Sequence, residues 1–370
     1  MRIHWIIFVA LVVIIAQSWV AKKWMLKGIG YNRFFSVYRA FEGQQIEMVE
    51  RISNRKLLPV PWLRIESKIS ENLEFKKQFN LDIKHQQFHK SLFSLMPYTA
   101  INRRHQIRCK KRGCYRLNSA SLTCGDLFGF QEATKIYELD AELLVYPKLV
   151  PLDEIPFPSR SWMGDVVVKR WVVDDPFMYA GVREYTAGDP LNSINWKATA
   201  RTGTLQVHKR DYTADPRIMI YLNMDVTDHM WGPITRPELI EKGIAYAASI
   251  ANYAIAQGID TGFGTNGYII DEPKQPVRIL PRGGQEQLTL LLDTMAKLII
   301  DRRVTFYTFV EEDIKSRVSS SFSGSMDYLF ITTHVTERMQ NQIKQLEDMG
   351  NSVKILWLED AHKEGISHGL

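Results

Sequence analysis

Acidic and basic residues are grouped in one stretch near the middle of the chain. They are Arg183, Glu184, Asp189, Lys197 and Arg201, all within nineteen residues. Acids and bases grouped in this way can form ion pairs, bind a charged partner or transfer protons. We favour a buried ion-pair network that holds a long crossing segment in place, ahead of a surface that binds a partner. A catalytic centre ranks third, because no nucleophile with a neighbouring base stands out.

Other residues that could bind metal or nucleic acid form weaker patterns. His85 and His89 are four residues apart, but no glutamate base or third ligand accompanies them, so solvated surface histidines are the simpler interpretation. The basic runs at 103–105 and 110–112 favour a solvated or lipid-facing strand over a nucleic-acid surface. No glycine-rich phosphate loop with the required lysine is present.

Composition limits the classes of protein to consider. The 370 residues indicate two globular domains, and 45% apolar with 24% charged residues argues against long disordered stretches. A net charge of +6 is weak evidence for nucleic acid and fits a position near an anionic membrane equally well. Cys109, Cys114 and Cys124 match no zinc spacing and favour a reducing compartment, although a Cys109–Cys114 disulfide is permitted.

An apolar run at the N-terminus predicts a membrane helix. Residues 5–21 carry no charge, and they would span roughly 25 Å as a helix, slightly less than a hydrocarbon core of about 30 Å. A cleavable signal peptide is the alternative, but a cut after Ala21 would place Trp19 at the −3 position, where small residues are needed. We therefore expect a single-pass protein of the cell membrane, with the bulk of the chain in the cytoplasm because the cations follow the run.

The remaining chain shows two periodicities. Alternating apolar and polar residues at Ile46–Ile52 and Trp62–Ile69 predict strands of an all-β sandwich-like domain. Continuous apolar runs at Arg217–Asn223 and Tyr328–Thr332 alternate with helical segments such as Pro237–Gln257, which predicts an α/β, doubly wound, mostly parallel sheet. The expected divisions are an anchor and juxtamembrane segment at 1–34, a β-domain at 35–150, a proline-rich linker and hallmark segment at 151–215, and an α/β domain at 216–370.

The stretch from 181 to 208 also resembles the hallmark of a known family. It contains Arg-Glu-Tyr at 183–185, Gly-Asp at 188–189, Ile-Asn-Trp-Lys at 194–197 and Ala-Arg-Thr-Gly at 200–203. In these elements the chain closely resembles the domain-of-unknown-function 58 family, although Asn192 stands where many members carry arginine. The segments around 41–63 and 112–129 look similar to the same family, so the resemblance covers most of the chain.

The resemblance implies several properties of the protein. The C-terminal domain would be von Willebrand factor A-like, and the partners would be a MoxR-type AAA+ ATPase and a transglutaminase-like membrane protein. No catalytic activity is established for the family. The hallmark positions carried over to this chain are Arg183, Glu184, Tyr185, Gly188, Asp189, Trp196, Lys197 and Arg201.

Similarity to von Willebrand factor A domains also suggests a Mg²⁺ site. Such domains bind the ion with carboxylate and hydroxyl oxygens after the first strand, here in one register Asn223, Asp225 and Thr227. A second register uses Asp225, Thr227 and His229. Either set matches the ligand motif only in part, and the later loop at 331–334 lacks the expected aspartate. Ordinary loop-capping roles for Asp225 and Thr227 are therefore the favoured interpretation.

The sequence therefore predicts a membrane-anchored, non-enzymatic interaction or scaffold protein without a cofactor. It would work with the ATPase in assembly or maturation of envelope or metabolic complexes. One alternative is a hydrolase with an unrecognised site around Glu184, Asp189 and His208. Another is a metal-dependent adhesion module that faces outside.

Overall fold

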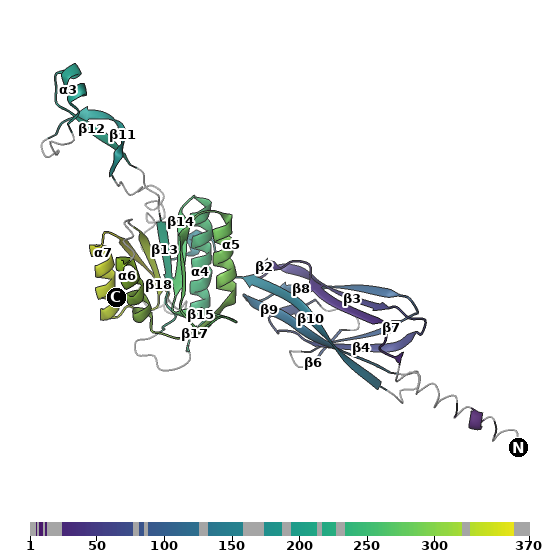
Figure 1. Ribbon diagram of the computed structural model, residues 1–370. Coiled ribbons are helices and arrows are strands. Elements are labelled where there is room, and N and C mark those ends of the chain that lie inside the picture. Colours follow the sequence, from purple (N-terminus) through teal and green to yellow (C-terminus); the bar gives the residue numbers. More distant parts are fainter. Residues whose placement is uncertain are drawn as a thin grey trace. The chain divides into compact units, whose positions relative to one another are not determined.

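A computed structural model divides the chain into two compact units, each described by itself (Figure 1). Unit 1 comprises Met1–Lys148 and Leu292–Lys297, and unit 2 comprises Leu149–Leu291 and Leu298–Leu370. The structure describes residues 5, 7–9, 12, 24–76, 81–84, 88–125, 132–157, 174–186, 194–212, 217–226, 234–319 and 326–358.

Unit 1 contains two β-sheets whose buried side chains form one hydrophobic core. The four-stranded sheet has the order β1 (Ile29–Phe35), β3 (Gln45–Asn54), β8 (Ala100–Cys109) and β5 (Leu73–Phe75). The six-stranded sheet has the order β2 (Arg39–Phe41), β10 (Glu132–Tyr146), β9 (Gly113–Gly125), β4 (Val60–Lys68), β7 (Phe88–Leu95) and β6 (Leu81–Lys84). Among the described strands of this unit only β2 and β10 pair in parallel, and the others are antiparallel.

Strand β3 shows why these residues form a two-layered unit. Every second side chain from Ile46 onward is buried, including Met48 and Ile52, while those between them reach the surface. Because successive side chains of a strand point to opposite faces, this alternation covers one face of the sheet with apolar groups that must pack on another layer. The alternation at Ile46–Ile52 thus corresponds to β3.

A cluster of charged and polar side chains lies inside this core. Arg33 Nη2 is 2.5 Å from Glu50 Oε1, and the second carboxylate oxygen is 3.3 Å from His105 Nε2. His89 Nδ1 lies 3.3 Å from Arg33 Nη2. His89 is therefore buried rather than solvated as predicted, because its place in β7 faces the core; His85 lies outside the described residues. Burial, together with the Arg33 charge, lowers the pKa of His89 to about 3, so the ring is neutral.

The main sheet of unit 2 has five strands in the order β16 (Val277–Arg282), β14 (Asp260–Thr265), β13 (Arg217–Leu222), β18 (Asp327–Thr332) and β19 (Ser352–Trp357). Strand β13 is parallel to both neighbours and β18 is parallel to β19, whereas β16 is antiparallel to β14. A separate two-stranded sheet joins β15 (Gly267–Ile269) to β17 (Leu298–Arg302). The longer helices are α4 (Pro237–Ala256), α5 (Gln285–Lys297), α6 (Phe306–Ser319) and α7 (Glu337–Asp348).

The predicted fold class is wrong as a whole. It combined a membrane helix, an all-β sandwich-like domain and a doubly wound von Willebrand factor A-like domain, whereas the described chain is mostly strand and distributes its strands over five sheets, two of them mixed. One physical reason lies between Thr265 and Val277. A parallel return needs a crossover of about a dozen or more residues, usually a helix, and here the chain returns through the short strand β15 instead.

The predicted membrane helix is also corrected. In the described part of the chain, no helix combines the length and the apolar character needed to cross a bilayer. This finding contradicts the predicted single-pass location. Residues 5–21, on which that prediction rested, lie mostly outside the described residues.

Candidate functional site

The hallmark stretch forms a small module of two strands and a short helix in unit 2. Strand β11 (Asp174–Glu184) pairs antiparallel with β12 (Gln206–Tyr212), and helix α3 (Trp196–Thr202) precedes β12 (Figure 1). The backbone N–H of Asn195 donates to the Gln206 carbonyl at 2.8 Å, which closes the helix onto the strand. Ile194 and Val207 are buried beneath this contact.

Helix α3 starts and stops at residues suited to those positions. The Asn195 side chain accepts a hydrogen bond from the Ala198 N–H at 3.0 Å, so it is the N-terminal cap. Gly203 follows the last turn with φ 73°, in the left-handed region that glycine adopts without strain.

The structure places the hallmark charges on the surface wherever it describes their side chains. Glu184, Lys197 and Arg201 are exposed, so they do not form the buried ion-pair network that we favoured. Arg183 lies in β11 opposite Val207. The remaining predicted positions Gly188 and Asp189 lie outside the described residues, and Tyr185 is half-buried.

The hydrolase hypothesis receives no support from these positions. His208 lies in β12 opposite Val182, two residue pairs away from the Glu184–Gln206 pair. Glu184 is exposed to solvent. The third member of the proposed site, Asp189, lies outside the described residues.

Instead, the module exposes large apolar side chains. Trp196, the first residue of α3, is 69% exposed, and Val182 and Leu205 are also exposed. Lys197 and Arg201 extend from the same helix. Tryptophan and arginine, which Trp196 and Arg201 supply here, are both enriched at the centre of protein–protein interfaces.

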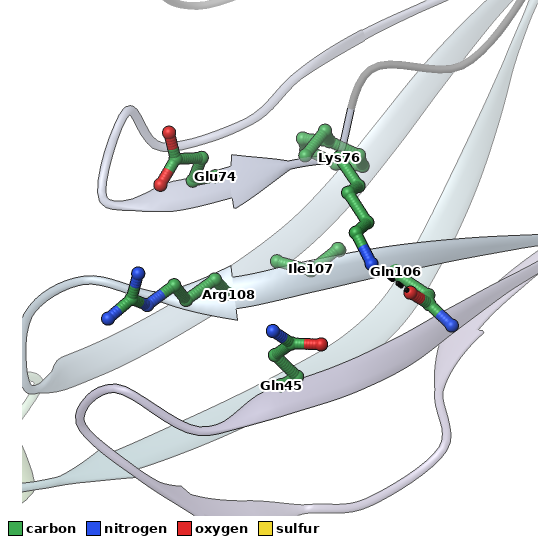
Figure 2. Close-up of a pocket in the computed structure, with 7 residues that line it drawn as sticks. Gln45, Glu74, Lys76, Gln106, Ile107 and Arg108 are labelled. Carbon is green, nitrogen blue, oxygen red and sulfur yellow. Dashed lines mark hydrogen bonds between the residues drawn. The ribbon is translucent and has the colours of Figure 1, made fainter.

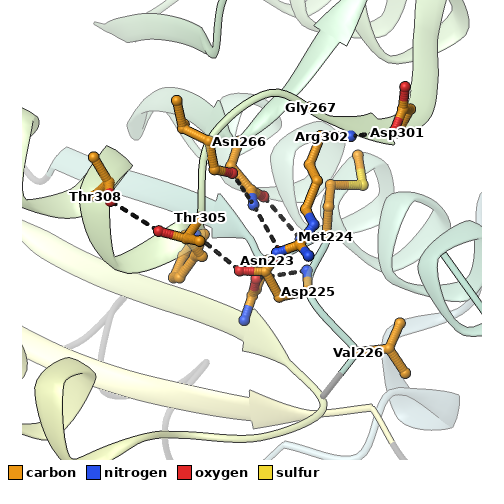
Figure 3. A network of polar contacts seen from close by, with 12 residues as sticks. Asn223, Met224, Asp225, Val226, Asn266, Gly267, Asp301, Arg302, Thr305 and Thr308 are labelled. Carbon is orange, nitrogen blue, oxygen red and sulfur yellow. Dashed lines mark hydrogen bonds and ion pairs between the residues drawn. The ribbon is translucent and has the colours of Figure 1, made fainter. Parts of the chain in front are cut away.

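A second set of polar residues gathers at the carboxyl end of β13, centred on Asp225 (Figure 3). Arg302 Nη1 lies 2.7 Å from Asp225 Oδ1, and the Asn266 side-chain amide donates to the same oxygen at 3.2 Å. The backbone N–H of Phe306, at the start of α6, donates to Oδ2 at 2.8 Å. The carboxylate is thus held by three donors from three parts of unit 2.

Neighbouring residues fix the loop that carries Asp225. The Asn223 amide donates to Thr332 Oγ1 at 3.0 Å, and Asn223 Oδ1 accepts the Asp225 N–H at 2.8 Å. Thr333 Oγ1 donates to the carbonyl of Val226 at 3.0 Å. The ends of the parallel strands β13 and β18 are therefore tied together at this edge of the sheet.

This arrangement bears on the predicted Mg²⁺ ligands. Asn223 and Asp225 do come together, but the cation beside the carboxylate is the Arg302 guanidinium, and the Asn223 side chain is already used in hydrogen bonds. Thr227 and His229 lie outside the described residues. Within the described ranges, no group of three or more His, Cys, Asp or Glu side chains could hold a metal ion.

Sequence reasoning missed Asn266 and Arg302. Asn266 directly follows β14, the parallel neighbour of β13, so its place at the shared carboxyl edge could have been inferred from that order. Arg302 closes β17, and no local pattern in the sequence indicated its contact with Asp225.

A shallow hollow of about 320 Å³ lies on the four-stranded sheet of unit 1 (Figure 2). Its rim carries the long polar side chains of Gln45, Glu74, Lys76, Gln106 and Arg108 around Ile107. Lys76 Nζ donates to Gln106 Oε1 at 3.4 Å, so some polar groups of the rim already have hydrogen-bond partners within the rim. The hollow lacks a serine, cysteine or threonine nucleophile among its lining residues.

Comparisons with known proteins identify the hallmark region. Residues 181–305 match the family described as "Protein of unknown function DUF58". An uncharacterized protein YeaD of Bacillus subtilis (strain 168) is 18% identical over 267 residues, which cover 72% of this chain but only 63% of that protein. The match to YeaD therefore spans less than two thirds of the relative's length.

Solved structures resemble only part of the chain. A non-cellulosomal cohesin from the archaeon Archaeoglobus fulgidus has 12% identity and a TM-score of 0.24, and it covers 31% of this chain and 90% of its own. A CARDB domain from Pyrococcus furiosus has 10% identity and a TM-score of 0.22, and the match covers 32% of this chain and 96% of that domain's chain. TM-scores this low carry no argument about fold or function.

Proposed function

We propose that the chain is a non-enzymatic interaction protein whose 181–208 module docks on a partner protein. The observation that carries the proposal is Trp196, which is 69% exposed on a helix that also presents Lys197 and Arg201. Exposing an indole to water is unfavourable. Burying it in a partner removes its apolar surface from water, and its N–H can still donate a hydrogen bond. The module lies inside the region that matches the family.

The chemistry of the second site supports a binding role over a reaction. A general base needs a free carboxylate, and Asp225 already accepts bonds from Arg302, Asn266 and Phe306. Its oxygens are used to hold the loop, so the edge of the sheet presents a fixed shape. A fixed shape lowers the ordering cost of binding a partner.

By analogy with the family, the partner we propose is a MoxR-type AAA+ ATPase, in the assembly or maturation of envelope or metabolic complexes. The transglutaminase-like membrane protein is a second candidate on the same analogy. Both follow from resemblance, and the contacts of the module indicate only the surface that the partner would cover.

Co-purification from the native host with the tagged full-length chain tests the proposal. We expect the ATPase to elute with the wild-type chain and to be lost, by about tenfold or more, with Trp196→Ser. Trp357→Ser is the matched control, because Trp357 is also exposed, at 42%, but lies in β19. Absence of the ATPase from an eluate with intact bait, or equal recovery with Trp196→Ser, would count against the proposal.

A further inference from the structure

Three loops at one end of unit 1 are joined into a single surface, here called the apolar tip. The apolar tip consists of residues 24–28, 54–59 and 96–99. The buried Asn54 side chain donates to the carbonyls of Leu58 at 3.0 Å and Met96 at 2.9 Å. The backbone N–H of Arg55 donates to the Gly28 carbonyl at 2.8 Å, which ties the first loop to the second. The three loops thus keep a defined arrangement.

The apolar tip exposes large apolar side chains from every one of its loops. Leu57 is 73%, Tyr98 69%, Met96 66% and Trp24 51% exposed, and Leu58 is also exposed. Single exposed apolar residues are ordinary, but a contiguous group marks a surface that is covered by something else.

The backbone of Tyr98 is a second indication that the three loops hold one defined conformation. Its φ of 54° lies in the left-handed region, which is unfavourable for a bulky side chain. Hydrogen bonds hold it there, because Tyr98 N–H donates to the Lys56 carbonyl at 3.3 Å and Thr99 Oγ1 donates to the Met96 carbonyl at 2.8 Å. A costly conformation maintained in this way keeps the ring in place.

The charges carried by the three loops of the apolar tip are all of one sign. Its three loops contain Lys27, Arg55 and Lys56 and no aspartate or glutamate. Lys56 Nζ donates to the carbonyl of Trp24 at 2.8 Å and to that of Met25. This ammonium therefore stabilises the contact between the first and second loops. Lys27 and Arg55 remain exposed at the rim, and Lys27 Nζ lies 5.8 Å from the centre of the Trp24 ring.

We propose that the apolar tip docks peripherally on an anionic lipid surface. Tryptophan, tyrosine, leucine and methionine would enter the interfacial layer, while Lys27 and Arg55 would meet the headgroups. A second copy of the chain fits less well, because a symmetric contact would bring the same cations together. The docking needs no membrane-spanning helix and does not depend on the proposed function of the 181–208 module.

Site-specific labelling of the full-length chain tests this docking. An environment-sensitive fluorophore is attached at Leu57→Cys or, as control, at Tyr38→Cys, both in a Cys114→Ser background because Cys109 and Cys124 are buried. Tyr38 is 81% exposed and follows the far end of β1, whose first residue adjoins the apolar tip. Both variants carry the same N-terminal residues, so any contribution of residues 1–23 is common to both.

We expect equimolar phosphatidylcholine–phosphatidylglycerol vesicles to raise and blue-shift emission at position 57 and to leave position 38 unchanged. Arg55→Glu should lower the apparent affinity for these vesicles by about tenfold, since it removes a cation and adds an anion. Arg108→Glu, the same change near the far end of β8, should have little effect. An unchanged signal at position 57, an equal response at position 38, or equal binding to vesicles of phosphatidylcholine alone would each overturn the proposal.

Discussion

Asp225 and Arg302 form a pair whose loss should be easy to measure. Their side chains are 9% and 14% exposed, so removing one partner leaves the other charge largely buried without compensation. We expect Asp225→Ala to lower the free energy of unfolding in urea by about 3–5 kcal/mol, whereas Glu272→Ala, on the surface, should change it by less than about 0.5 kcal/mol.

The double variant separates the charge from the packing. Asp225→Ala combined with Arg302→Met removes both charges, so it should recover part of the stability lost in the single variant. A single-variant loss below about 1 kcal/mol, or a double variant no more stable than Asp225→Ala, would contradict this account of the pair.

His89 predicts a pH dependence of stability in unit 1. Its pKa is about 3 in the folded chain and near its ordinary value of about 6.5 when unfolded, so the unfolded chain binds the proton first as pH falls. The stabilisation is complete above about pH 6.5 and is lost progressively down to about pH 3. Between pH 7 and pH 5 this histidine alone should remove about 2 kcal/mol of the free energy of unfolding.

His89→Gln isolates that contribution from the other histidines. The variant should lose about 2 kcal/mol less than the wild type between pH 7 and pH 5, whatever its stability at pH 7. Carboxylates such as Glu50 contribute mainly at lower pH: burial alone would raise the pKa of Glu50, but the His105 hydrogen bond and the Arg33 charge outweigh it and lower the pKa. Parallel pH profiles for the two proteins would show that His89 does not titrate as described.

At the scale of elements, Gly262 controls how β16 joins the sheet. The pairing of β14 with β16 shifts register between Thr261 and Phe263, so Gly262 lies at the irregularity. A Cβ at this glycine would lie 2.6 Å from the Ile279 carbonyl oxygen and 2.8 Å from the Pro281 nitrogen, both backbone atoms. The antiparallel edge strand can approach this closely only because the side chain is absent.

Gly262→Ala should therefore destabilise unit 2 by about 2–3 kcal/mol, because the backbone of β16 must move. Chemical denaturation followed by circular dichroism measures the change. Leu280→Ala is the control on the same strand, since Leu280 is exposed and should tolerate truncation within about 0.5 kcal/mol. Equal stability of Gly262→Ala and the wild type would show that the strand spacing adapts without cost.

Some elements could be predicted from the sequence and others could not. The segment Pro237–Gln257 predicted α4 nearly to its ends, because proline begins it and glycine follows it. Helix α6 was missed, although Phe306, Phe309, Val310 and Ile314 lie on one buried face at helical spacing. Aromatic and β-branched residues favour strands over helices, so local preference argued against a helix here, and packing in the tertiary core overrides it.

At the scale of the whole chain, the two units have separate hydrophobic cores. We expect scanning calorimetry of the full-length chain to resolve two unfolding transitions. His89→Gln should alter the pH dependence of one transition, and Asp225→Ala should lower the temperature of the other. A single transition shifted by both variants would show that the units unfold together.

The candidate sites were predictable to different degrees. The 181–208 module was identified from its residues, but its charges were expected to be buried, and burial depends on neighbours that sequence spacing does not supply. Asp225 was identified, whereas Arg302 was not, because its contact joins segments 77 positions apart. The apolar tip joins three separate loops, and no single segment of the sequence indicates it.

The guanidinium beside Asp225 has a consequence for how the protein could be handled and regulated. Its charge belongs to the chain itself, so the edge of the sheet is assembled as unit 2 folds. Chelators such as EDTA should leave that edge intact, and fluctuating levels of divalent ions in the cell should not open or close it.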